Sequence, residues 1–231
     1  MSTPDFPQWR AAQPNRRFTD WLRARTLSDW KAATNHRFVD ELAAGTLSDE
    51  AFRPYLVQDY AFIETLTTVV GFAVARAPRM PAKKRWAEFL GVLTSDENDY
   101  FQRAFDAVDV PAHERVEATL SSTTQTLRDA MLDAANAGTY ADLLAVVVPA
   151  EWIYLTWASD RRDARPPQPQ YAEWIDLHAI PEFADFVGWL RNELDTLGPE
   201  LDTATRASVA ARFEQLVRLE IAFFEQAYTT A

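Results

Sequence analysis

The chain has 231 residues, 48% of them hydrophobic and 13% aromatic, and a formal net charge of −11. This length and composition suffice for one large hydrophobic core, and nothing in them indicates disorder. The absence of cysteine excludes disulfides, thiolate metal sites and a cysteine nucleophile, and the acidic balance argues against a nucleic-acid partner, which needs clustered Lys and Arg.

The apolar segments and the glycine content narrow the fold class. The N-terminus lacks an apolar signal core, and the longest apolar run, LLAVVVPA at 143–150, is far shorter than the ~20 residues that span a membrane. We therefore expect a cytoplasmic protein with no membrane segment. Only six glycines are present, which disfavours β-hairpins and predicts one all-α domain over residues 1–231. Whether residues 1–15 are ordered or form a disordered arm is left open.

Apolar residues that recur every three or four positions predict nine helices. In chain order they span residues 16–33, 36–44, 49–77, 81–108, 115–137, 139–160, 171–178, 181–197 and 203–228. The segment RPPQPQ, 165–170, is predicted to be a loop. Pro149 falls inside the helix over 139–160, where the missing backbone donor predicts a kink beside Glu151 and a place for a pocket between helices.

Three acidic residues, Asp59, Glu151 and Glu220, lie in apolar and aromatic stretches of three long helices. A carboxylate is rarely buried without a partner. Each of these acids has an aromatic residue three or four positions away, which places ring and carboxylate on one helical face. One such acid is usually a surface residue of an amphipathic helix. For three together, a shared cavity with aromatic walls becomes an equally good interpretation.

Four segments, in this order, resemble the TenA (thiaminase II) family: FVDELAAGTLSDEAFRPYLVQDYAFIE at 38–64, LLAVVVPAEWIYLTW at 143–157, YAEWIDLHAIPEF at 171–183 and FEQLVRLEIAFFEQAY at 213–228. The resemblance implies a haem-oxygenase-like multi-helix bundle. It also implies hydrolysis of thiamin or its breakdown products, with release of the hydroxymethyl aminopyrimidine. Where one branch of the family has a Pro-Cys pair, this chain has Ala150, and it resembles the cysteine-free class E. The implied substrates are then aminomethyl and N-formylaminomethyl pyrimidines.

The resemblance also implies residue roles. Asp59 matches the aspartate that contacts the amino group and ring nitrogen of the pyrimidine, and Glu220 matches the glutamate that binds the ring nitrogens from the other side. Glu151 is the expected general acid–base in place of the thiol. The other implied substrate-binding residues are Tyr154, Phe62, His178, Phe224 and Tyr60. Phe62 and His178 stand where the cysteine branch has tyrosines, and Phe224 is expected to stack on the ring.

Other polar residues are weighed against structural roles. For His178, capping or packing is slightly favoured over a site role. We expect His36 and His113 to be structural or exposed. Glu64 and Glu97 are interpreted as solvated or structural rather than as site residues. Without an E-x-x-H motif or a nucleotide-binding loop, no metal and no cofactor is predicted.

Two alternatives to a hydrolase stay open. One is a catalytically silent binding or regulatory protein on the same bundle. The other is a haem-oxygenase-like oxidase of another heterocycle, which oxygen uptake would reveal. The expected partners are a small-molecule aminopyrimidine and further copies of the chain. Trp152, Trp157 and Trp189 exceed the apparent need of one core and predict a homodimer or homotetramer.

Overall fold

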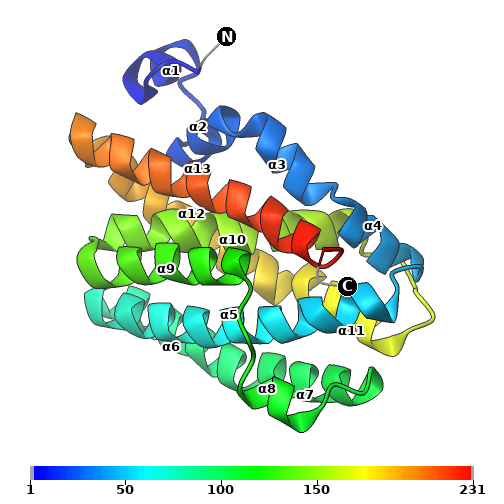
Figure 1. Cartoon of the computed structure of the whole chain (residues 1–231). Coiled ribbons are helices and arrows are strands. Elements are labelled where there is room, and N and C mark those ends of the chain that lie inside the picture. Colours follow the sequence, from blue (N-terminus) through cyan, green and yellow to red (C-terminus); the bar gives the residue numbers. More distant parts are fainter. Residues whose placement is uncertain (1–2, 230–231) are drawn as a thin grey trace.

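Every regular element in the part of the chain that the structure describes, residues 3–229, is helical, which confirms the all-α prediction. In this computed structural model the body is formed by the long helices α5 (Asp49–Arg76), α9 (Ser122–Ala137), α10 (Tyr140–Asp160), α12 (Pro181–Leu197) and α13 (Thr203–Gln226). Figure 1 shows α5, α9 and α10 running along the length of the molecule. Shorter helices complete the bundle: α1 (Phe6–Ala12), α2 (Phe18–Arg25), α3 (Leu27–Thr34), α4 (Arg37–Ala44), α6 (Met80–Val92), α7 (Asn98–Ala107), α8 (Ala112–Val116) and α11 (Pro169–Ala179).

Helix α10 is the central element, packed against α9, α11, α12 and α13. A capping box starts it, in which Thr139 and Asp142 satisfy each other's backbone amides. By length and composition α10 could cross a membrane, but 89% of its most apolar window is buried inside the bundle. A helix that is apolar on all sides is the expected core helix of such a bundle. Pro149 lies within α10, which continues to Asp160.

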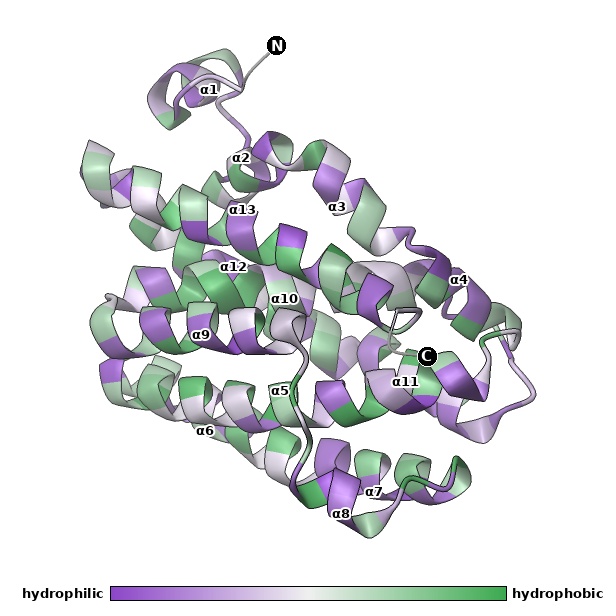
Figure 2. Ribbon diagram, in the orientation of Figure 1, coloured by the Kyte–Doolittle hydropathy of each residue, from purple (hydrophilic) through white to green (hydrophobic). Residues whose placement is uncertain are grey.

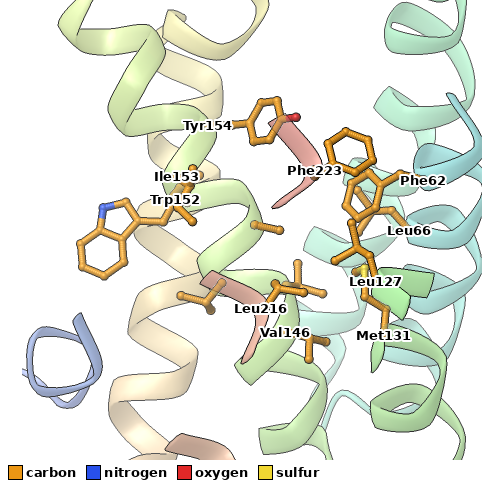
Figure 3. Packing of buried hydrophobic residues seen from close by; sticks show 14 of the residues in the cluster. Phe62, Leu66, Leu127, Met131, Val146, Trp152, Ile153, Tyr154, Leu216 and Phe223 are labelled. Atoms are coloured by element: carbon orange, nitrogen blue, oxygen red, sulfur yellow. The ribbon is translucent and has the colours of Figure 1, made fainter. Parts of the chain in front are cut away.

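Hydrophobic and hydrophilic residues alternate along the outer helices, as Figure 2 shows for α6 and α9. The apolar sides meet in one core, part of which is drawn in Figure 3. There Tyr154 of α10 and Phe62 of α5 lie on either side of Phe223, while Trp152 points away from them. Trp152 packs against Trp30 with ring centroids 4.6 Å apart.

The tryptophans behind the oligomer prediction are accounted for within the chain. Trp152 and Trp157 are 6% and 1% exposed. Trp189 is half-buried and packs edge-on against Trp86, with centroids 5.4 Å apart. These residues therefore give no support to a homodimer or homotetramer, which stays a prediction without this argument.

Two predicted helices are broken by local hydrogen bonding. The helix over 16–33 divides at Thr26, whose hydroxyl bonds the carbonyl oxygens of Leu22 and Arg23. The prediction of one helix over 115–137 is wrong at its start, because α8 ends at Val116 and α9 begins only at Ser122. The buried Gln58 side chain holds the intervening segment, donating to the carbonyl of Thr119 and accepting from the amide of Ser121. Side-chain partners of this kind replace helical backbone bonds.

The predicted helix over 81–108 is interrupted by a π-helical turn, Leu93–Glu97, labelled η1. Two adjacent hydroxyls bond backward into this region: Thr94 Oγ1 to the Leu90 carbonyl at 2.9 Å and Ser95 Oγ to the Gly91 carbonyl at 2.7 Å. Single π-turns frequently occur at functional sites. This one brings Glu97 to the interior side of the α6–α7 arm.

The first 15 residues, whose order the sequence left open, include a helix. Asp5 caps α1 through the amide of Gln8 at 3.0 Å. Phe6 is 3% exposed and meets Phe18 of α2 edge-on at 5.0 Å. Residues 3–15 therefore dock on the bundle in part, whereas positions 1 and 2 of the predicted arm lie outside the described residues.

Candidate active site

A narrow cavity of about 20 Å³, here called the inner cavity, lies between α5, η1, α10 and α11. It has room for about one water molecule. Its lining residues are Asp59, Phe62, Ile63, Leu66, Glu97, Ala150, Glu151, Tyr154, Trp174 and His178. Five of the eight predicted site residues are in this set, contributed by three helices that are far apart in sequence.

Helical periodicity explains how each element contributes. On α5, Asp59 is followed by apolar residues at i+3, i+4 and i+7, which share its face. On α10, Glu151 and Tyr154 are three apart, and on α11, Trp174 and His178 are four apart. Each pair therefore presents one polar group and one ring to the same space.

The three predicted acids are all buried: Asp59 is 1%, Glu151 7% and Glu220 1% exposed. Burial raises the pKa of Asp59 to about 7, although a hydrogen bond from Tyr55 works against the rise. Burial, and next the charges of Glu220 and Asp59, raise the pKa of Glu151 to about 8. Burial and then Asp59 raise the pKa of Glu220 to about 8. All three carboxyls are thus shifted toward the protonated form and titrate near neutral pH instead of near pH 4.

Two carboxyl oxygens at the site have no hydrogen-bond partner among residues 3–229: Asp59 Oδ2 and Glu220 Oε1. An unpaired buried acceptor costs about 1–3 kcal/mol. Such atoms are uncommon in folded proteins and call for an explanation such as a bound ligand. Asp59 lines the inner cavity, and Glu220 is close enough behind its wall for its charge to affect Glu151.

A chain of hydrogen bonds orients the tyrosines. The Trp174 indole N–H donates to the Tyr55 hydroxyl at 3.2 Å, and the hydroxyls of Tyr55 and Tyr154 lie 3.0 Å apart. Tyr55 also bonds Asp59. When Asp59 is ionised it can only accept, so in that state Tyr55 donates to it and accepts from Tyr154. The lone pairs of Tyr154 are then left as acceptors at the cavity wall.

His178 is neutral, and its polar ring lines the inner cavity. Its Nδ1 donates to the carbonyl oxygen of Trp174 at 2.9 Å, so in the neutral ring Nε2 is an acceptor. Burial lowers its pKa to about 4, against the effect of that hydrogen bond. His178 therefore combines the two roles weighed from the sequence: it packs edge-on against Trp174 at 4.3 Å, and it lines the inner cavity.

Three predicted site residues do not line the inner cavity. Glu220 lies just behind the wall, close enough for its charge to affect Glu151 and Tyr154. Phe224 is fully buried and stacks on Phe38 at 5.4 Å, so it supports the wall instead of facing a ligand. Tyr60 points elsewhere: its hydroxyl bonds Asn98 at 2.9 Å, because a residue adjacent to Asp59 is turned about 100° around the helix.

Five lining residues were not among the predicted site residues: Ile63, Leu66, Glu97, Ala150 and Trp174. Glu97, interpreted as solvated or structural, is half-buried in η1 and lines the inner cavity. Burial, then Glu151 and Asp59, raise its pKa well above the usual range. The π-turn that places it has no simple sequence pattern. Trp174 had a readable signal, since it lies one helical turn before His178 in YAEWIDLH.

The predictions for His36, His113 and Glu64 agree with the structure. His36 caps α4 and its Nε2 lies 3.1 Å from Glu225, and the side chain of His113 is 80% exposed. Glu64 is exposed, as predicted. Within residues 3–229, no group of three or more His, Asp or Glu side chains has the arrangement of a metal site.

Comparison with known proteins identifies the family. The chain matches the TENA/THI-4/PQQC family over residues 23–230. It belongs to this family. Among curated relatives, the aminopyrimidine aminohydrolase of Halalkalibacterium halodurans is 26% identical over 77% of this chain and 80% of the relative. The aminopyrimidine aminohydrolase of Bacillus subtilis is 23% identical over 92% of this chain and 90% of the relative.

Solved structures confirm the haem-oxygenase-like fold. A TenA homologue from P. horikoshii superposes with a TM-score of 0.83 at 24% identity, covering 94% of this chain and all of that one. A cyanobacterial haem oxygenase from Synechocystis, in complex with haem, has a TM-score of 0.61 at 15% identity, covering 93% of this chain and 94% of that one. At these identities the likeness concerns the arrangement of the helices.

Proposed function

We propose that this TENA/THI-4/PQQC family protein is a thiamin-salvage hydrolase that converts aminomethyl or N-formylaminomethyl pyrimidine into the hydroxymethyl pyrimidine, using carboxyl groups in place of a thiol. The observation that carries the proposal is the convergence of Asp59, Glu97 and Glu151 on one buried cavity with aromatic walls, with Glu220 close behind that wall. The curated relatives named aminopyrimidine aminohydrolases support the substrate class.

An aminopyrimidine fits the polar atoms of the site. Its exocyclic amino group donates, and its ring nitrogens accept. Ionised Asp59 accepts from the amino group, which gives its unpaired oxygen a partner. Once the cavity has widened to admit the ring, protonated Glu220 behind the wall donates to a ring nitrogen. Protonation or strong hydrogen bonding at the ring draws electrons away from the methylene carbon. The rings of Tyr154, Phe62 and Trp174 enclose the heterocycle.

Glu151 handles the proton at the reacting carbon. The bond between the methylene carbon and the amine nitrogen breaks, and its electron pair leaves with the nitrogen. A water oxygen bonds to the carbon, and its proton passes through the Glu151 carboxyl to the departing amine. One substrate and one water thus yield the hydroxymethyl product and ammonia, or formamide from the formylated substrate. A pKa of about 8 suits this exchange, since a group that titrates near the working pH both gives and takes a proton.

The side chain of Ala150 lines the inner cavity, and the resemblance to the TenA family matches this position to the thiol of the cysteine branch. Its methyl group contributes no nucleophile. Since the whole chain lacks cysteine, a covalent thiol intermediate is excluded and direct attack by water is the route that the available groups support.

The deciding experiment is incubation of the purified protein with thiamin, aminomethyl pyrimidine and formylaminomethyl pyrimidine, with detection of the hydroxymethyl product. We expect turnover of the two amino compounds. Glu151→Gln should lower kcat by about 100- to 10,000-fold, the usual contribution of a general acid–base, with little change in shape.

Two controls make the result specific. Glu64→Gln, on an exposed face of α5, should keep full activity. Binding of the hydroxymethyl product to Glu151→Gln should survive, because Asp59 and Glu220 are intact. Tight binding by the wild type without any turnover would replace the proposal with a non-catalytic binding protein, and oxygen consumption would replace it with an oxidase.

A further inference from the structure

A second, larger cavity of about 290 Å³ adjoins the inner cavity and is here called the outer pocket. It lies between α6, η1 and the junction of α11 with α12. Glu97 and His178 line both spaces, so these two side chains form the wall between them. Figure 1 shows α6, which lines the outer pocket, running beside α5.

The inner cavity alone is too small for the ligand that its polar atoms suit. A volume of about 20 Å³ accommodates one water, whereas small-molecule pockets typically span about 300–1,000 Å³. Displacing the Glu97–His178 wall would join the inner cavity to the outer pocket. Glu97 sits in a π-turn, an irregular element whose backbone bonds differ from those of α6 and α7. The outer pocket is therefore the route by which a substrate reaches Asp59.

The floor of the outer pocket is aromatic. Phe89 and Phe186 are 6% and 5% exposed and stack with centroids 4.0 Å apart. Phe183 stands edge-on to the shared His178 at 5.1 Å. Ring faces attract cations as well as apolar groups.

The rim of the outer pocket is acidic. Asp96 and Glu182 are exposed there, whereas Glu88 pairs with Lys84 at 2.9 Å and lies 3.8 Å from Arg85. Arg85 is the only basic side chain that the structure places on this lining, apart from the neutral His178. One cation thus faces several carboxylates, and a positively charged ligand gains from both the rim and the aromatic floor.

We propose that the outer pocket is an access chamber that selects substrates with a protonated amine on the methylene carbon over neutral amides. The proposal rests on the proposed function and specifies its preferred substrate. An aminomethyl group, like other alkyl amines, is protonated near neutral pH, whereas a formylamide carries no charge. The acidic rim concentrates the amine and leaves the formylated compound unaffected. The ammonium product departs through the same charged space.

The test uses the double variant Asp96→Asn/Glu182→Gln, which removes two rim charges and touches none of the residues that line the inner cavity. We expect KM for the aminomethyl pyrimidine to rise about threefold to tenfold, as loss of two exposed charge interactions predicts, with kcat unchanged. KM for the formylaminomethyl pyrimidine should stay the same. High salt should reproduce this selective rise in the wild type and have little further effect on the variant.

A matched control is Asp163→Asn/Glu200→Gln, which makes the same change of net charge at two exposed positions outside the outer pocket. It should leave both KM values unaltered. In the rim variant, equal changes in KM for the two compounds, or an unchanged KM for the amine, would overturn the access-chamber proposal. The hydrolase proposal would stay intact. If the wild type turned over neither compound, the proposed function would fail; calorimetric Kd values for the same compounds and proteins would then decide the charge selection separately.

Discussion

At the scale of single residues, the site depends on the Tyr55 hydroxyl behind the cavity. Tyr55 accepts from Trp174, lies 3.0 Å from the Tyr154 hydroxyl, and forms a hydrogen bond with Asp59 that works against the burial-induced rise in the pKa of that acid. Tyr55 is 1% exposed, and its ring packs on Phe38 at 4.3 Å. It is a positioning residue, held by the same core that holds the helices together.

Tyr55→Phe should therefore shift the pH dependence of kcat/KM. Without the donated hydrogen bond the pKa of Asp59 rises, so the acid limb of kcat/KM shifts to higher pH, and kcat/KM near neutral pH falls about tenfold for a loss of roughly 1.4 kcal/mol. Tyr171→Phe is the control, because that buried hydroxyl bonds the Leu47 carbonyl away from the site. An unshifted profile in Tyr55→Phe would show that Asp59 need not ionise.

At the scale of elements, α4 depends on the turn that ends it. Gly45 has φ of 68°, in the left-handed region that side chains disfavour, and its carbonyl accepts from the Gln168 side chain at 3.1 Å. An added Cβ would lie 2.6 Å from Pro167 Cδ. The close approach ties α4, which carries Phe38, to the loop before α11 and its cavity residues.

Gly45→Ala should lower the free energy of unfolding by about 1–3 kcal/mol, through backbone strain and the clash with Pro167. Gly188→Ala offers the matched comparison. Gly188 lies inside α12 with open space around its Cβ position. Alanine there should raise the stability of the helix by up to about 1 kcal/mol relative to glycine. Urea unfolding of both variants measures the contrast; similar stabilities would mean that the turn tolerates a side chain.

At the scale of the whole molecule, the buried acids link stability to pH. Asp59, Glu151 and Glu220 have folded pKa values near 7–8, above the ordinary 3.8–4.5. The folded state thus binds protons that the unfolded state has released. Their stabilising contribution is full below about pH 4 and is lost as the pH rises through 7–8. This loss is the cost of keeping carboxyl groups in a dry site.

Glu220→Gln should remove part of the loss of stability that the folded protein undergoes as the pH rises. At pH 8.5 the variant is expected to melt roughly 3–6 °C above the wild type, since a 1 kcal/mol change moves Tm by about 2–4 °C in a chain of this size. Near pH 5, where Glu220 is protonated, the two should melt together apart from the effect of the amide. Differential scanning calorimetry across pH 5–9 checks this, and parallel curves for the two proteins would contradict a buried, protonated Glu220.

Local pattern was sufficient for the all-α class, for most helix bounds, and for Asp59, Glu151, Tyr154 and Phe62 as cavity residues, whereas His178 was indicated only by the resemblance to the TenA family. These results follow from helical periodicity, from capping residues such as Ser48 and Thr139, and from the rarity of acids in apolar helices. The order of four short segments was enough to indicate the family.

Tertiary structure alone decided which side chains share the site. The π-turn turned Glu97 inward, Phe224 went behind the wall because Phe38 and Tyr55 occupy its ring faces, and Tyr60 was directed to Asn98. The raised pKa values and the outer pocket likewise come from elements distant in sequence. The reason is physical: periodicity assigns a residue to a face of its own helix, whereas burial, hydrogen-bond partners and electrostatic neighbours are set by what the other helices place against that face.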